Sequence, residues 1–319
     1  MSAAQHVENF LQLLTAGLLT GAVYGLMCVG LSIIFGVMRV INFAQGEFMM
    51  LGMYLAYFCF GLFGSYLLLP ELIAPYAAAL AAGPLVFLLG FVLHKWLVSR
   101  VTGTSSTALD SEGHYAQLIL TLGISLVLAN GGLVVFGSAP VSISTPLSST
   151  PWIVGPLLGD DVLIFVNQGQ SIAAVIAIAV VALFAVLMAR SRLGRSLRAA
   201  ADNPEAAIYM GIDVDRAYRL AFAFGVGITA VGGGLLASTN PFQPYVGIEY
   251  VIVMYAGVVL GGLGSLSGAF FGGLIIGLVQ QLSALVLPTQ LQNTSIFVCF
   301  LIIVLVKPDG LFGRAARRA

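Results

Sequence analysis

Long apolar runs separated by short polar connections dominate the sequence and limit what it can fold into. A helix that crosses a bilayer needs about 20 mainly apolar residues, and runs of this length recur along the whole chain. Hydrophobic residues make up 59% of the 319 and charged residues only 8%, whereas a soluble domain carries about 25% charged residues. We therefore expect an all-α, polytopic transmembrane helical bundle in which residues 1–319 form one domain.

The apolar runs give the positions of the candidate spans. The region Tyr250–Val306 is long enough for three short spans, broken near Gly264 and at Pro288. The total is about nine spans, within a range of roughly eight to ten. The other six candidates are Phe10–Phe35, Phe43–Phe63, Ile73–Trp96, Tyr115–Phe136, Ile172–Ala189 and Tyr218–Ser238.

Lysine and arginine are confined to particular connections, which indicates how the spans are oriented. The connections Gly64–Leu72, Gly137–Gln170 and Thr239–Glu249 contain neither residue and are expected outside. The C-terminus and Arg39 are expected in the cytoplasm, and no removable signal peptide is recognised at the N-terminus. The basic residues that mark the cytoplasmic side are Lys95, Arg100, those of Arg190–Arg219, Lys307, Arg314, Arg317 and Arg318.

The outside loop Val141–Gln170 is rich in Ser, Thr, Pro and Gly and is too short to be a separate domain. We expect a plain connector here. The alternative is a packed lid that covers the outer opening of the helical bundle.

The segment Arg190–Arg219 is the most strongly charged part of the chain, with six arginines and four acidic residues between two apolar runs. It is therefore expected to be a cytoplasmic loop, counted as residues 190–217.

A short helix with marked ends is predicted inside this loop. Asn203 is an N-cap candidate, Pro204 fits the first helical position, and Glu205 suits the first turn beside the positive end of the helix dipole. Gly211 is the expected left-handed stop, followed by the apolar Ile212.

Such a helix is expected to expose the side chains of Ala206, Ala207 and Met210. One interpretation is a solvated loop that happens to be well capped. The other is a docking helix, because small residues let another protein approach closely while the caps hold the shape.

A polar cluster at Arg39, Asn42, Gln45 and Glu47 lies between two apolar runs. Charged groups at membrane depth are costly and tend to face an interior or a water-filled path. If the segment is a cytoplasmic turn, Glu47 is a first-turn acid and Arg39 marks the cytoplasmic side. If it is an unwound segment inside the membrane, Asn42, Gln45 and Glu47 line or gate a translocation route. The sequence leaves both alternatives open.

A weaker similarity links the stretch INFAQGEFMMLGMY at Ile41 with NPFQPYVGIEYVIVMY at Asn240. Each contains Asn, Phe, Gln, Gly and Glu before an apolar run. Internally repeated transporters place broken segments at corresponding positions in their two halves. Gaps are needed to align these two stretches, so we attribute the similarity to chance.

No residue pattern indicates catalysis, a metal site or a nucleotide site. The glycine-rich run Gly257–Gly277 lacks the G-K-[ST] of a phosphate loop, and its glycine spacing is instead typical of closely packed membrane helices. Neutral net charge argues against nucleic acid as a partner. Cys28, Cys59 and Cys299 lie in apolar runs and are interpreted as buried fillers.

Three stretches in the same order resemble the permease subunits of ABC importers for branched-chain amino acids, and the resemblance extends over nearly the whole chain. They are GLLTGAVYGLMCVGLSIIFGVMRVINFAQGEFMMLG at Gly17–Gly52, RAAADNPEAAIYMGID at Arg198–Asp213, and GVVLGGLGSLSGAFFGG at Gly257–Gly273. The sequence is similar to the first of the two permeases in the leucine/isoleucine/valine system.

The resemblance implies a permease of the ABC importer type in the cell inner membrane, a transport subunit and not an enzyme. No cofactor is expected in this chain, because ATP and Mg²⁺ would be held by two separate ATPase subunits. A second, related permease would complete a heterodimer in the membrane lipid, and a periplasmic binding protein would deliver the substrate. The family often has His where this chain has Gln45, so no titratable role is implied there. The coupling helix that contacts the ATPase corresponds to Asn203, Pro204, Glu205, Ala206, Ala207, Met210, Gly211 and Ile212.

Two other functions remain open from the sequence. Permeases for urea and short amides share all three stretches, so the resemblance identifies the substrate less specifically than it identifies the family. An ion-coupled secondary transporter is the alternative from a different class, and for it only the cluster from Asn42 to Glu47 offers mid-membrane polar groups.

Overall fold

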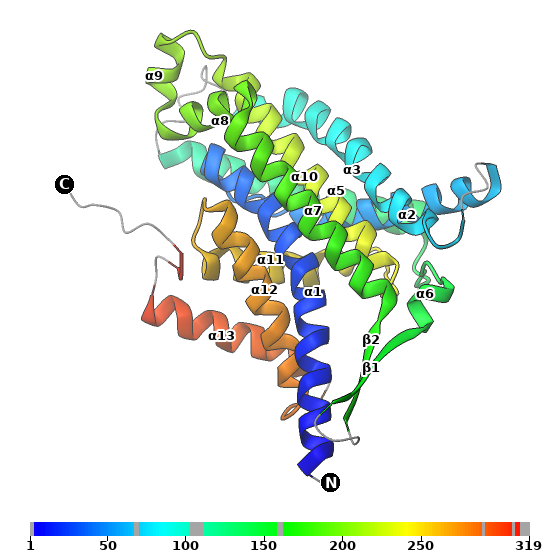
Figure 1. Cartoon of the computed structure of the whole chain (residues 1–319). Helices are drawn as coiled ribbons and strands as arrows, with labels where there is room; N and C mark the ends of the chain where they lie inside the picture. The colour runs from blue at the N-terminus through cyan, green and yellow to red at the C-terminus, as the bar shows by residue number, and fades with distance from the viewer. Residues whose placement is uncertain are drawn as a thin grey trace.

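A bundle of long helices makes up most of the computed structural model, which describes residues 3–66, 70–102, 111–157, 162–288, 291–307 and 310–312 (Figure 1). Seven of the described helices are long and apolar enough to cross a membrane, and two more are apolar but shorter. The predicted polytopic helical bundle is confirmed, with a helix in every region where a span was expected. The long helices are α1 (Ala3–Met38), α2 (Gln45–Tyr66), α3 (Ala74–Leu93), α5 (Ser111–Phe136), α7 (Gln168–Arg190), α10 (Val214–Ala237) and α12 (Leu266–Ser283), and the shorter ones are α11 (Val246–Gly261) and α13 (Gln292–Val306).

Short elements connect the long helices. The π-helix η1 (His94–Val98) and α4 (Ser99–Thr102) continue α3 beyond Leu93, and α6 (Pro146–Ser149) follows α5. Two polar helices, α8 (Arg192–Asp202) and α9 (Pro204–Tyr209), fill the charged loop between α7 and α10. The predicted C-terminal basic residues Arg314, Arg317 and Arg318 lie outside the described residues.

The loop Val141–Gln170 is more ordered than the expected connector. It contains α6 and an antiparallel hairpin of β1 (Pro151–Leu157) and β2 (Val162–Asn167), with Trp152 opposite Val166 and Ile153 opposite Phe165. A two-stranded hairpin is only marginally stable alone. Here β2 packs along α1, and Ile164 is buried. This hairpin is a small addition to the predicted all-α fold.

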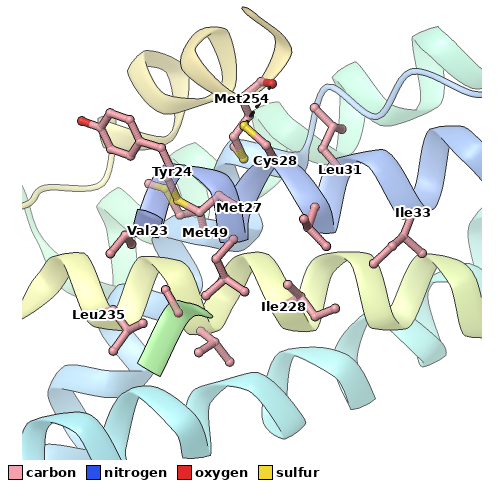
Figure 2. Close-up of a cluster of buried hydrophobic side chains, with 14 of the residues drawn as sticks. Val23, Tyr24, Met27, Cys28, Leu31, Ile33, Met49, Ile228, Leu235 and Met254 are labelled. Carbon is pink, nitrogen blue, oxygen red and sulfur yellow. Dashed lines mark hydrogen bonds between the residues drawn. The ribbon is translucent and has the colours of Figure 1, made fainter. Parts of the chain in front are cut away.

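The centre of the bundle is formed by α1 and α10, which run antiparallel. Most of the apolar window of α10 is buried, 89%, compared with 22% for that of α5. Figure 2 shows Met27 of α1 near Met49 of α2, with Ile228 and Leu235 of α10 below them. Cys28 donates a hydrogen bond to the carbonyl of Met254 at 3.6 Å, and all three cysteines are free. Helices α2, α3, α7, α11 and α12 pack against α1, α10 or both, while α5 and α13 lie further out against α2 and α12.

The glycine-rich run has the packing role predicted for it. Gly257 of α11 faces Gly273 of α12, with only 3.2 Å between an added Cβ and the Gly273 backbone, and Gly21 and Gly25 of α1 touch α12 as closely. Gly264 lies in the turn between α11 and α12 and has a φ of 81°, so its role is conformational. Small residues therefore let α1, α11 and α12 meet backbone to backbone.

The two ends of the bundle carry different elements. The N-terminus and the hairpin lie at one end, and α8 and α9 at the other (Figure 1). At 1.5 Å per residue α1 is about 54 Å long, well beyond the roughly 30 Å hydrocarbon core. The hairpin strand β2 packs against α1 toward the end of the bundle that carries the N-terminus (Figure 1).

Candidate functional site

The connection between α1 and α2 is unwound, and it begins at Arg39. This residue ends α1 with a φ of 56°, the left-handed conformation that residues other than glycine seldom adopt. Its guanidinium donates to the main-chain carbonyl of Ala201 in α8 at 3.2 Å. Arg39 therefore lies at the same end of the bundle as the charged loop, as its basic character predicted.

Three residues further on, the connection is buried among polar partners. The Asn42 side chain donates to the Gln45 amide oxygen at 2.9 Å and accepts from the backbone N–H of Ala44 at 3.2 Å. The Gln45 amide nitrogen donates to the Thr229 hydroxyl at 2.5 Å, and that hydroxyl reaches the Met27 carbonyl at 3.4 Å. These groups form one hydrogen-bonded chain from the connection through α10 to α1.

How deeply these hydrogen-bonded groups are buried in the bundle decides between the two alternatives for the segment. The carbonyl of Gly225 also accepts a hydrogen bond from Gln45, at 3.3 Å. Counted from the start of α10 at Val214, Gly225 lies about 16 Å along the helix at 1.5 Å per residue. Asn42 and Gln45 are 1% and 0% exposed. The segment thus starts at the surface with Arg39 and enters the bundle interior within a few residues, so it is not a plain surface turn.

Glu47 belongs to the same buried region but faces a different neighbour. Its carboxylate lies against Gly247 in the first turn of α11, 2.8 Å from where a Cβ would stand. The side chain is 1% exposed, and among the described residues its Oε2 has no hydrogen-bond partner. A carboxylate in such a place is costly, and only a glycine at 247 leaves room for it.

The stretch at Asn240 has the same kind of structure as the one at Ile41. Both are unwound connections that lead into a helix, α11 in one case and α2 in the other. Gly46 and Gly247 pack against each other, because a Cβ on Gly46 would lie 2.7 Å from the Gly247 carbonyl carbon. Phe242 is buried beside Tyr54, with ring centroids 4.9 Å apart. The two similar stretches therefore meet inside the bundle.

At the other candidate site, the predicted caps of α9 are present. The Asn203 side chain accepts from the backbone N–H of Ala206 at 3.0 Å, and Pro204 is the first helical residue. Gly211 has a φ of 77°. Its N–H donates to the Ile208 carbonyl and that of Ile212 to the Ala207 carbonyl, both at 2.9 Å. This pair of bonds is the Schellman motif, so α9 is fixed at both ends.

The exposed face of α9 differs from the expected one at Ala207. This side chain is 3% exposed and points into the chain, whereas Ala206 and Met210 are exposed as predicted. Ile208 and Tyr209, which the sequence prediction omitted, are 47% and 89% exposed. The packing of α9 against α8 and α10 places Ala207 on the inner face of the helix. A large aromatic residue in a polar loop was the available signal for Tyr209.

Curated relatives match nearly the whole chain. It is 29% identical to the high-affinity branched-chain amino acid transport system permease protein LivH of Salmonella typhimurium, over 96% of each chain. It is 28% identical to the corresponding protein BraD of Pseudomonas aeruginosa, over 97% of each. A probable branched-chain amino acid transport permease of Methanocaldococcus jannaschii is 30% identical, over 81% of this chain and 76% of that one.

Among solved structures, PsaBC from Streptococcus pneumoniae in complex with Fab covers 97% of each chain with a TM-score of 0.47 and 14% identity. The family described as "Branched-chain amino acid transport system / permease component" matches residues 13–306. With that match extending over almost its full length, the chain belongs to the branched-chain amino acid transport permease family.

Proposed function

We propose that this chain is the membrane-spanning permease subunit of an ATP-driven ABC importer that carries branched-chain and similar hydrophobic amino acids across the cell inner membrane. The observation that carries the proposal is α9, a helix fixed at both ends that presents Tyr209 and Met210 to solvent beyond the membrane spans. A helix with this shape and an exposed apolar surface suits a docking partner. The names of the relatives, which are branched-chain amino acid permeases, support the substrate class.

The proposal assigns the remaining tasks to partners. Two ATPase subunits would hold ATP and Mg²⁺ and receive α9 on the cytoplasmic side, which is also the side proposed for the C-terminus. A second, related permease would complete the pathway, and a periplasmic binding protein would deliver the amino acid to the opposite end. Asn42, Gln45 and Glu47 are proposed to lie along the translocation path, because they are the buried polar groups where the two unwound connections meet.

The assembly is tested by ATP hydrolysis in nanodiscs. The chain alone is expected to hydrolyse no more ATP than a mock preparation. Hydrolysis should appear once the ATPase subunits and second permease are added, and it should rise when the binding protein is loaded with leucine. Leucine uptake that depends on an ion gradient and not on ATP would contradict the proposal, and stimulation by urea in place of leucine would contradict the substrate class.

Cysteine labelling tests the translocation path. In a background without Cys28, Cys59 and Cys299, cysteines at 42, 45 and 47 are expected to resist a small water-soluble thiol reagent at rest. All three positions are at most 1% exposed. If they line the path, labelling should rise during ATP turnover.

Two control positions bracket this result. Arg192→Cys, at an exposed position of α8, should react in both states, and Leu126→Cys, 65% exposed on a membrane helix, should react in neither. A labelling rate at 42, 45 and 47 that is the same with and without turnover would rule out a path role.

A further inference from the structure

A groove with entirely apolar walls lies between α3, α7 and α10. Its volume is about 450 Å³, within the roughly 300–1,000 Å³ typical of small-molecule sites. Gly83 of α3 and Gly227 of α10 stand opposite each other at its floor, with 3.1 Å between an added Gly227 Cβ and the Gly83 carbonyl oxygen. Glycine at both positions lets α3 and α10 approach each other closely beside the groove.

The groove opens toward the surroundings of the membrane helices. Leu80, Leu183 and Leu187 line it and are 42%, 72% and 38% exposed. All three lie within membrane-spanning candidates. In a bilayer, such a surface meets hydrocarbon chains.

Positive charge gathers at one end of the groove. Phe87 and Phe224 contact each other in its wall, with ring centroids 4.9 Å apart. One turn beyond Phe87, the Arg219 guanidinium carbon lies 5.3 Å from the Phe91 ring centroid. Arg190, the last residue of α7, follows Leu187 by one turn.

Nearby acidic residues balance this charge only in part. Lys95 on η1 adds a third cation at the same end, and two acidic residues, Asp213 and Asp215, lie at the start of α10. Within the described part of the chain, the Arg219 Nε has no hydrogen-bond partner. The excess is therefore cationic, at the end that the charged loop marks as cytoplasmic.

We propose that this groove binds an anionic glycerophospholipid, with one acyl chain along the apolar walls and the phosphate near Arg219 and Arg190. Arginine is well suited to phosphate because its planar guanidinium offers several donors in a fixed geometry. Basic pockets between membrane helices on the cytoplasmic side are a recurring form of headgroup site. Because the apolar walls and the cationic end are adjacent, the structure favours a lipid over a protein helix, which would need no charge at that position.

The test is native mass spectrometry of the purified full chain titrated with phosphatidylglycerol or with phosphatidylcholine of the same acyl chains. Phosphatidylglycerol is expected to bind about tenfold more tightly, because the two arginines act on its net charge. Arg219→Gln should lower the affinity for phosphatidylglycerol to that for phosphatidylcholine. Leu183→Trp should reduce binding of both lipids by filling the groove. If Arg219→Gln fails to fold, Arg190→Gln replaces it.

Matched controls are present in the same chain. Leu126→Trp adds the same bulk to an exposed position of α5, and Arg192→Gln removes an exposed arginine from α8; both should leave lipid binding unchanged. Equal binding of the two lipids by the unaltered chain would overturn the proposal. So would a loss of lipid binding in Leu126→Trp as large as the loss in Leu183→Trp. Release of the second permease by Leu183→Trp, with lipid binding intact, would assign the groove to a subunit interface instead.

Discussion

Replacing both Tyr209 and Met210 with alanine is expected to release the ATPase subunits and abolish uptake, while the chain still inserts and folds. The two side chains are 89% and 81% exposed, so their removal leaves no cavity within the chain. An interface hot spot contributes about 2 kcal/mol or more, and about 1.4 kcal/mol is a tenfold change in affinity. Together the two substitutions should weaken ATPase binding by roughly 1,000-fold. Co-purification of the ATPase subunits and whole-cell leucine uptake are the two measurements.

Tyr245→Ala is the matched control, because Tyr245 is 43% exposed and precedes α11, away from the charged loop. It should retain ATPase binding. Normal co-purification of the ATPase subunits with the Tyr209 and Met210 double variant would show that α9 is not part of the docking surface.

The caps of α9 give an independent check on the same helix. Gly211→Val should also weaken docking, because a β-branched residue resists the φ of 77° that ends the helix. Nothing lies within 4 Å of an added Cβ, so the cost is in the backbone alone. Gly211→Asn should be tolerated, since asparagine adopts the left-handed conformation more readily. Ala207→Trp acts differently: the residue is buried, and its substitution is expected to disrupt the loop itself.

Gly46→Val is expected to destabilise the chain by about 3 kcal/mol, the upper end of the usual cost of overpacking. An added Cβ would stand 2.7 Å from the carbonyl carbon of Gly247, closer than the 3.0 Å below which real Cβ contacts essentially never occur. Because the obstacle is backbone, no rotamer change relieves it, and the α1–α2 or the α10–α11 connection must move. The measurement is thermal unfolding in detergent, followed by leucine uptake.

Gly61→Val on the same helix provides the comparison. Nothing lies within 4 Å of an added Cβ at Gly61, so this variant should unfold at the temperature of the unaltered chain. If the two valine variants unfold together, the close contact between Gly46 and Gly247 is not required for stability.

The sequence was sufficient for the membrane helices because their signal is local. Runs of apolar residues broken at Gly264 and Pro288 correspond to α11, α12 and α13, and the caps of α9 depend on Asn203 and Gly211 alone. The hairpin was missed although its strands are rich in aromatic and β-branched residues, because proline and glycine in that loop suggested a connector.

The features that escaped prediction depend on residues far apart in the chain. Gln45 is buried because Thr229 and Gly225 offer it hydrogen bonds across 184 and 180 positions. Nothing near Gln45 encodes these partners. The inward direction of Ala207 likewise depends on how α9 sits against its neighbours, since a helix of six residues is too short to show an apolar face by its spacing.

The bond between Arg39 and Ala201 places the last turn of α8 only three residues from Asn42. A displacement of the loop by a docked ATPase would reach the buried amides by a short route through this bond, beside the contacts of α8 with α1 and α10. The acceptor is a main-chain carbonyl, which every amino acid possesses. The bond therefore does not depend on the side chain of residue 201, but it does depend on the length, charge and left-handed backbone of Arg39.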